Sequence, residues 1–402
     1  MLLHFVLCFC YLHVASGAVA NSTLYVPKWN EFLTNQAILV KDVFQDYDQD
    51  ISPVYTNIDL TKPLGSDPLA PDRLNYTVFL YSFKLVGVVE PEERVTVVIE
   101  VSEHWHDPRL TWESEKYGNI TTLHVRQSKI WSPTLTAYGA SELLDLRDQD
   151  FRLVGLDNTG HIYTSVTVLF STNCAMKVAR FPFDSQTCQL RFCMPIFYRL
   201  QVKLLSEIYT GILNKTLWKS MGNSEWDLVN LTDTIDILAY NDNFGDIEMA
   251  VFELKLKRNP MYYIYMIVFP SFIINFLSII GVFMKNSDTM SKLNVGLTNI
   301  MTMTFILGVM ADKIPKTGNI PLLGIYIIIN LVIMIVAVGI TVGIGELRKW
   351  AVPKLKSEKS RMRKRLLNFL GDPLETFFII VLESVTIANF VMMIVFWIID
   401  VG

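Results

Sequence analysis

Four long apolar stretches follow Arg258, where the composition of the chain changes. Residues 259–284 hold 26 residues without a charge, and at about 1.5 Å per residue a helix of that length crosses about 30 Å of hydrocarbon. Further apolar stretches predict a second helix over 291–312, a third over 318–345 and a fourth over 377–400. We therefore expect four membrane spans, with Glu383 at the cytoplasmic interface of the last.

Before Arg258 the pattern is that of β-strands. In residues 96–105 apolar and polar side chains alternate, and residues 252–257 alternate in the same way. A period of two is typical of a strand with one buried and one solvated face. Many short strands separated by Pro, Gly, Asn and Asp turns predict a β-sandwich over 21–258.

Composition agrees with a membrane protein. Of 402 residues, 51% are hydrophobic and 18% charged, which is too apolar for an ordinary soluble protein. The net charge of -4 gives no basic excess, so we expect no nucleic-acid partner. The apolar run in residues 1–20, followed by small residues, resembles a secretory signal peptide, and a buried first helix is the alternative.

The topology follows from the loops. Segment 346–376 carries nine Lys and Arg, which predicts a short cytoplasmic loop by the positive-inside rule and places both termini outside the cell. The predicted glycosylation sites all precede the first span, as expected for an extracellular region: Asn21, Asn75, Asn119, Asn214 and Asn230.

Three cysteines remain after the signal peptide, so one stays free or pairs between chains: Cys174, Cys188 and Cys193. The first two enclose an aromatic segment, Phe181-Pro182-Phe183-Asp184. A disulfide between them would close a 15-residue loop and remove roughly 3 kcal/mol of unfolded-state entropy. The loop would then present a rigid apolar tip.

This spacing and core resemble the Cys-loop family of pentameric ligand-gated ion channels. The run from Trp105 to Trp112 fits the family pattern W-x-D-x-R-L-x-W, and Trp131-Ser132-Pro133 precedes Tyr138 as in its first binding loop. Arg258 before the first span and Pro270 within it also fit. Within the family the chain is most similar to invertebrate nicotinic acetylcholine receptor-like subunits. The resemblance implies the Cys174–Cys188 disulfide, a homo- or heteropentamer in a lipid bilayer, and a small-molecule agonist.

The second span carries a candidate pore lining. Spacings of four and three residues keep one stripe on a single helical face: Asn294, Thr298, Met301, Phe305, Gly308 and Asp312. Met and Phe at this spacing often serve only packing, but Asn, Thr and Asp would be unfavourable against lipid. We expect Met301 and Phe305 to form a hydrophobic gate. The carboxylates of Asp288 and Asp312, which lie on either side of Ser291 in the sequence, would attract cations, so we expect a cation-selective pore. Anion selectivity is the alternative.

The resemblance also implies an aromatic cage between neighbouring subunits that holds a cationic amine. Pro195 stands where acetylcholine receptors place Trp, and Glu100 stands where another Trp is usual. The chain therefore binds an unusual ligand, another amine or protons, or serves as a non-binding accessory subunit. The candidate ligand-binding residues are Tyr138, Pro195, Phe197, Tyr240, Phe244, Glu100, Tyr163 and Ser165.

Coupling between ligand and gate is expected where the sandwich meets the spans. By resemblance, the aromatic tip and the acidic turn at 90–93 press on residues 313–321, while Arg258 braces the strand that leads into the first span. No phosphate loop, His-Glu-x-x-His helix or Gly-x-Ser-x-Gly elbow occurs, so we expect no enzyme, cofactor or metal site. The predicted coupling residues are Phe181, Pro182, Phe183, Asp184, Glu90, Arg258, Lys313 and Pro315.

Overall fold

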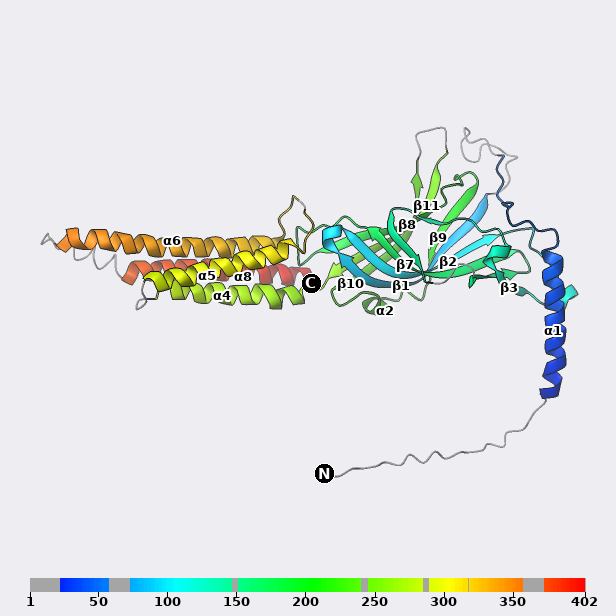
Figure 1. Ribbon diagram of the computed structural model, residues 1–402, viewed down its shortest axis with the longest axis horizontal. Helices are drawn as coiled ribbons and strands as arrows, with labels where there is room; N and C mark the ends of the chain where they lie inside the picture. The colour runs from blue at the N-terminus through cyan, green and yellow to red at the C-terminus, as the bar shows by residue number, and fades with distance from the viewer. Residues whose placement is uncertain are drawn as a thin grey trace, which may run out of the picture. The chain divides into compact units, whose positions relative to one another are not determined.

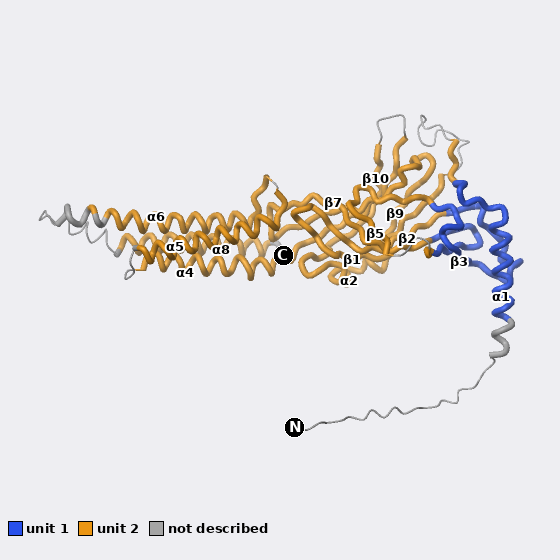
Figure 2. The backbone as a smooth tube through the Cα atoms, in the orientation of Figure 1, with its two compact units in different colours: residues 1–53, 106–132, 153–163 blue, residues 54–105, 133–152, 164–402 orange. Residues whose placement is uncertain are grey.

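The computed structural model describes residues 22–57, 73–146, 151–239, 245–284, 289–316, 318–356 and 372–401. The predicted signal peptide and four predicted site residues lie outside these ranges: Asn21, Tyr240, Phe244 and Asp288. The chain forms two compact units (Figure 2). Unit 1 comprises residues 1–53, 106–132 and 153–163, and unit 2 comprises residues 54–105, 133–152 and 164–402.

Unit 1 contains residues 106–112 of the run from Trp105 to Trp112, and the carboxylate of Asp107 is fully buried there. This carboxylate accepts hydrogen bonds from the Arg109 side chain at 2.9 and 2.7 Å and from the Tyr47 hydroxyl at 3.1 Å. A buried carboxylate is tolerated only when it is paired in this way. Burial raises the pKa of Tyr47 to about 12, so the phenol remains protonated at neutral pH. The elements of unit 1 are α1 (Ser22–Val43), η2 (Ser114–Tyr117), β3 (Thr122–Arg126), η3 (Gln127–Lys129), β6 (Leu153–Asp157) and the start of β7 (His161–Asn173).

Unit 2 holds two β-sheets (Figure 1). One has the order β7-β2-β1-β9, with β5 pairing with β7, and the other has the order β10-β11-β8-β4. Strands β1 and β2 pair antiparallel, whereas β1 and β9 pair parallel. The strands are β1 (Leu74–Val89), β2 (Arg94–His106), β4 (Thr136–Ala137), β5 (Ala140–Asp145), β8 (Ser185–Cys193), β9 (Val202–Ile208), β10 (Trp226–Leu238) and β11 (Ile247–Arg258), with η1 (Glu90–Glu92) between β1 and β2 and helix α2 (Lys215–Met221) before β10.

The predicted β-sandwich is confirmed, and alternation along the strands builds its core. The expected strands at 96–105 and 252–257 lie within β2 and β11. Phe170 of β7 packs on Phe192 of β8 with ring centroids 5.4 Å apart, and Phe192 packs on Phe252 of β11 at 6.1 Å. Aromatic side chains bury large apolar areas, so these three rings join the two sheets.

Four helices of membrane-spanning length follow the sandwich (Figure 1). The first, Met261–Val282, combines α3 (Met261–Tyr263), a π-helical turn η5 (Ile264–Val268) and α4 (Phe269–Val282). Pro270 lacks an N–H and its ring crowds the preceding turn, and the wider π turn accommodates this. The other three are α5 (Thr289–Ala311), α6 (Leu322–Lys356) and α8 (Asp372–Val401). Helices α4, α6 and α8 share a core that includes Ile279, Val282, Met334, Ala337 and Leu382, and Ile300 of α5 packs against it.

Two helices extend past their predicted limits. Helix α6 continues to Lys356, beyond residue 345, and α8 begins at Asp372, before residue 377. Glu, Leu, Arg and Lys are good helix formers, so charge ends an apolar stretch without ending the helix. Glu383 is only 9% exposed and lies well inside α8, as the predicted range 377–400 requires.

Candidate functional site

Arg258, at the end of β11, is the most enclosed charge at the base of the sandwich. Among the described residues, its fully buried side chain pairs with Asp184 at 2.9 Å, with Glu90 at 2.8 Å and with Glu225. Its backbone N–H also donates to the Asp184 carbonyl at 3.1 Å. The three acids come from three separate segments. One side chain therefore joins these segments where the chain enters the first membrane-length helix.

Aromatic rings complete the surroundings of this guanidinium. Its Cζ lies 4.1 Å from the ring centroid of Trp226, 4.8 Å from that of Phe181 and 5.7 Å from that of Tyr263. Burial alone would lower the pKa of Arg258, but Coulomb attraction and hydrogen bonding to Asp184 raise it above its ordinary value. The cation is thus permanent, and four predicted coupling residues meet here: Arg258, Asp184, Glu90 and Phe181.

The segment between Cys174 and Cys188 holds the start of α6. The predicted disulfide is present, and Cys193 is a free, buried cysteine whose pKa is raised by burial. Backbone N–H groups of Leu322 and Leu323 donate to the carbonyls of Ala179 and Phe181, both at 3.1 Å. The first N–H groups of a helix have no acceptor within the helix. The disulfide loop therefore caps α6, with Pro182 and Phe183 buried between these contacts and the Asp184 pair.

The acidic turn between β1 and β2 contacts the same loop. Glu93 has a left-handed backbone (φ 50°), its carbonyl accepts from the Cys174 N–H at 2.6 Å, and its carboxylate accepts from the Met176 N–H at 3.3 Å. A cavity of about 630 Å³ separates the turn from the end of α5. Its lining is Pro91, Glu92 and Glu93 on one side and Ala311, Asp312, Ile314, Pro315 and Lys316 on the other.

The candidate pore stripe lies on the exposed side of α5. Met301 is 75% exposed and Phe305 is 71% exposed, which is unusual for large apolar side chains. The opposite side, with Asn299 and Met303, is buried at 2% and 0% exposure. The predicted pore residue Ser291 is exposed as well. The four helices of this chain thus pack without using the stripe, whose members are all exposed: Asn294, Thr298, Met301, Phe305, Gly308 and Asp312.

Three predicted ligand-binding residues follow strands of the β10-β11-β8-β4 sheet: Tyr138 follows β4, and Pro195 and Phe197 follow β8. Thr136 of β4 pairs with Cys193 of β8, and the Tyr138 N–H donates to the Arg191 carbonyl at 2.8 Å. Tyr138 is exposed and lies beside Arg191 of β8, whereas Pro195 and Phe197 follow the end of β8 at Cys193. Met249 of β11 also pairs with Cys193, so the start of β11 lies beside the end of β8.

Glu100 and Ser165 lie on the other sheet. The Ser165 hydroxyl donates to the Glu100 carboxylate at 2.8 Å, from β7 to β2, and both face outward. Tyr163, in unit 1, is 37% exposed and stands opposite Gly155 of β6. A Cβ at residue 155 would lie 2.1 Å from the Tyr163 ring, so this glycine provides the space for the tyrosine. The predicted ligand residues thus fall into two groups on different sheets.

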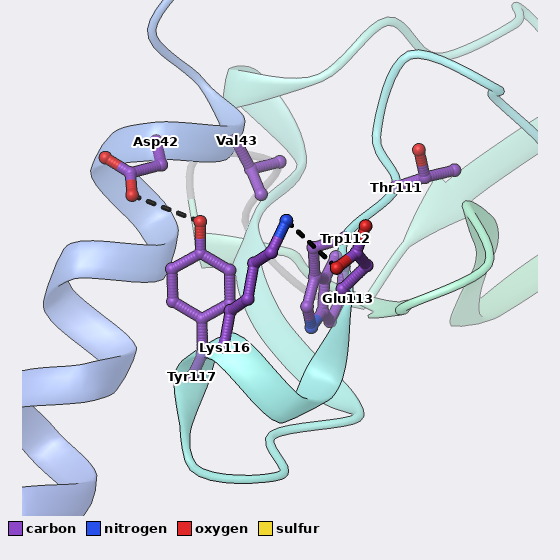
Figure 3. A pocket seen from close by; sticks show the side chains of 7 residues that line it. All are labelled: Asp42, Val43, Thr111, Trp112, Glu113, Lys116 and Tyr117. Atoms are coloured by element: carbon purple, nitrogen blue, oxygen red, sulfur yellow. Dashed lines mark hydrogen bonds and ion pairs between the residues drawn. The ribbon is translucent and has the colours of Figure 1, made fainter.

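A second cavity, of about 440 Å³, lies in unit 1 (Figure 3). The Tyr117 hydroxyl donates to Asp42 at 3.1 Å, and Lys116 pairs with Glu113 at 2.9 Å above Trp112. Neither this cavity nor the one near α5 is lined by a described residue of the predicted ligand site. The described predicted glycosylation sites are all exposed: Asn75, Asn119, Asn214 and Asn230.

Sequence reasoning missed Glu225 and Trp226 as partners of Arg258. Trp226 pairs directly with Arg258 in the β10–β11 register, so its ring covers the guanidinium. Glu225 pairs with Arg258 and accepts from the Tyr263 hydroxyl at 2.7 Å. An acid next to an aromatic residue at the start of a strand is a weak signal, and only the register reveals its target.

Comparison with known families accounts for this arrangement. The model described as "Neurotransmitter-gated ion-channel ligand binding domain" matches residues 36–260, and "Neurotransmitter-gated ion-channel transmembrane region" matches residues 267–375. The chain belongs to the neurotransmitter-gated ion-channel family. Members of this family are ion channels rather than enzymes. The chain is a multi-pass membrane protein with four candidate spanning helices among its described residues.

Individual relatives are distant. The chain is 25% identical over 301 residues to "Ligand-gated ion channel 4" of Caenorhabditis elegans, which covers 72% of this chain and 46% of that protein. It is 25% identical over 340 residues to "Acetylcholine receptor subunit alpha-1-B" of Xenopus laevis, covering 83% and 67%. For "Neuronal acetylcholine receptor subunit alpha-9" of Gallus gallus the identity is 23% over 333 residues, covering 80% and 65%. This family member thus spans about half of the nematode relative (46%) and about two thirds of the vertebrate ones.

Proposed function

We propose that this chain is a subunit of a pentameric ligand-gated channel whose cation-selective pore is lined by α5. The supporting observation is the exposure of the Asn294 to Asp312 stripe, while the opposite side of α5 packs within the chain. Exposed Asn, Thr and Asp side chains are unfavourable against lipid, and five copies around an axis would place them in water. Rings of Met301 and Phe305 would then form the gate.

Charge supports the selectivity part of the proposal. Asp312 is exposed at one end of the stripe, and a ring of five carboxylates attracts cations by Coulomb attraction. Asp288 would supply the second ring, and it lies outside the described residues.

The agonist in this proposal is an organic cation bound between neighbouring subunits. Tyr138 and Phe197 would supply aromatic faces from one subunit, and Glu100 would supply a carboxylate from the other. The separation of these residues onto two sheets supports a site shared between two chains. Pro195 is exposed and has no aromatic ring, which favours the second candidate function, an accessory subunit that does not bind agonist.

The test is expression of the whole chain in oocytes, alone and with a nicotinic partner subunit. Acetylcholine, other amines and acidic solution are applied while surface protein is measured by biotinylation. We expect current from the chain alone with a reversal potential that follows external sodium. A reversal potential that follows chloride overturns cation selectivity. Surface protein that conducts only with a partner, and keeps the partner's agonist midpoint, supports the accessory role instead.

A further inference from the structure

A chain of hydrogen bonds crosses the helix bundle behind the candidate pore stripe. Asn299 of α5 donates through Nδ2 to Oδ1 of Asn275 in α4 at 3.1 Å. Asn275 donates through its own Nδ2 to the Thr386 hydroxyl in α8 at 3.4 Å, and this hydroxyl donates to the Leu382 carbonyl at 3.0 Å. Three side chains thus connect the helix of the candidate pore with two helices behind it.

These side chains are buried in an otherwise apolar core. Asn275 and Thr386 are 0% exposed and Asn299 is 2% exposed, beside Ile279, Val282 and Leu382. Burial of an amide without a partner is unfavourable by far more than a net hydrogen bond is favourable. The three groups therefore hold one another in a single arrangement more strictly than apolar side chains would.

The position of Asn299 gives this chain of bonds its consequence. At about 100° per residue, Asn299 lies roughly 200° around α5 from Met301, which is almost directly behind the proposed gate. A bond at this point resists rotation of α5 about its axis. Rotation by one residue would break the bond to Asn275 and move Met301 off the stripe.

We propose that Asn275 and Asn299 are positioning residues that fix the rotation of the pore helix, with Thr386 anchoring Asn275 from α8. This inference rests on the proposed role of α5 as the pore lining. It assigns the two asparagines no contact with ions. Their effect on the channel passes entirely through the orientation of α5.

The same bundle offers a matched control. Asn389 of α8 donates through Nδ2 to Asn330 of α6 at 2.9 Å and to the Tyr326 carbonyl at 3.1 Å. Asn330 is 0% exposed and Asn389 is 5% exposed, so the chemistry and burial match those of the first pair. The described hydrogen bonds of this second pair join α8 to α6 and do not include α5.

The experiment measures which side of α5 faces water and needs no agonist. Met301→Cys and Met303→Cys are introduced separately into the full chain in oocytes, and a biotin-bearing, membrane-impermeant methanethiosulfonate is applied from the bath. The parent chain, with buried Cys193, gives the background. Labelling rates are normalised to surface protein, and their ratio at residues 301 and 303 is compared between backgrounds.

Single and double substitutions give opposite results if the inference holds. Asn299→Leu leaves Oδ1 of Asn275 without its partner, and Asn275→Leu does the same to Nδ2 of Asn299, so each should lower the 301:303 ratio roughly tenfold. Asn275→Leu with Asn299→Leu removes both groups, while Thr386 keeps its bond to Leu382, so the ratio should return to within about threefold of the parent. Asn330→Leu should leave the ratio unchanged.

Each remaining outcome decides between the two proposals. Equal labelling at residues 301 and 303 in the parent chain overturns the pore assignment itself. If the parent chain has a high 301:303 labelling ratio and neither single substitution alters it, the positioning role alone is overturned. The positioning role is also overturned if the labelling ratio of the double variant falls by as much as the effects of the two single substitutions combined. If the asparagine variants fail to reach the surface, Thr386→Val decides: a fall of about threefold supports the role of this chain of bonds, and an unchanged ratio overturns it.

Discussion

Replacement of Arg258 by Met should destabilise the protein strongly. Arg258→Met keeps an unbranched side chain among Trp226 and Phe181 but removes the positive charge. Asp184, at 2% exposure, and Glu90, with its carboxylate 15% exposed, would then be left without their cation. Breaking a buried ion pair by removal of one partner lowers the free energy of unfolding by about 3–5 kcal/mol.

This magnitude converts into a measurable shift. For a domain the size of the β-sandwich, about 240 residues, 1 kcal/mol moves the melting temperature by about 2–4 °C, so we expect a fall of roughly 6–20 °C. The assay is thermal unfolding of detergent-solubilised protein, followed by fluorescence-detected size exclusion. Arg94→Met is the matched control, because Arg94 pairs with Glu92 at 2.7 Å with side chains 34% and 57% exposed. Exposed pairs contribute about 0–1 kcal/mol, so the control should shift by less than about 4 °C.

A second substitution tests the cause. Asp184→Asn removes the most buried unpaired carboxylate, so in the Arg258→Met background it should restore part of the lost melting temperature. The same change in the parent chain should be destabilising, because Arg258 loses an ion-pair partner. If Arg258→Met shifts the melting temperature no more than Arg94→Met does, the enclosed charge cluster does not stabilise the fold and the reasoning is refuted.

Three further predictions concern other parts of the chain. Ser in place of both Cys174 and Cys188 should lower the free energy of unfolding by about 2–5 kcal/mol and reduce surface expression, measured by biotinylation. Asp312→Asn should reduce inward sodium conductance about twofold to fivefold, because a screened ring of five charges contributes roughly 1 kcal/mol at the pore mouth; unchanged conductance would exclude Asp312 from the pore. Burial raises the pKa of Glu103, against its hydrogen bond with Tyr76, so the folded protein binds more protons than the unfolded one between the two pKa values. Glu103→Gln should therefore raise the melting temperature at pH 8 and have little effect near pH 4, and a gain that grows on acidification would contradict this sign.

The parts of the fold that follow from local pattern could be predicted from the sequence. Alternation at 96–105 and 252–257 identified strands β2 and β11, and uncharged runs identified the four helices. Steps of four and three residues identified a stripe on α5 that the structure places on the exposed side. All of these are properties of short windows, in which periodicity alone determines which side chains share a face.

The partners of individual residues could not be predicted in the same way. Arg258 was expected to brace its strand, but the sequence does not reveal which acids pair with it. Glu225 precedes Arg258 by 33 residues and Glu90 precedes it by 168 residues. The absence of charge identifies the apolar stretches but does not indicate what the asparagines within them bind. A buried amide must find a partner, so Asn275, Asn299, Asn330 and Asn389 could have been expected to pair between helices.

The two networks share one element, the first membrane-length helix. Arg258 fixes the strand that enters this helix, and Asn275, about 20 Å further along it, contacts Asn299 on the pore helix. The disulfide loop holds the start of α6 directly, whereas the acidic turn is separated from the end of α5 by a cavity. The described side-chain hydrogen bond of Asn299 therefore gives α5 one connection to the helix that leaves the sandwich, and packing against α6 gives it another. A rotation of the first helix that preserves the Asn275–Asn299 bond must turn α5 with it, whereas a rotation that breaks the bond leaves Oδ1 of Asn275 and Nδ2 of Asn299 buried without this partner. The bond therefore favours concerted movement of the two helices over independent movement.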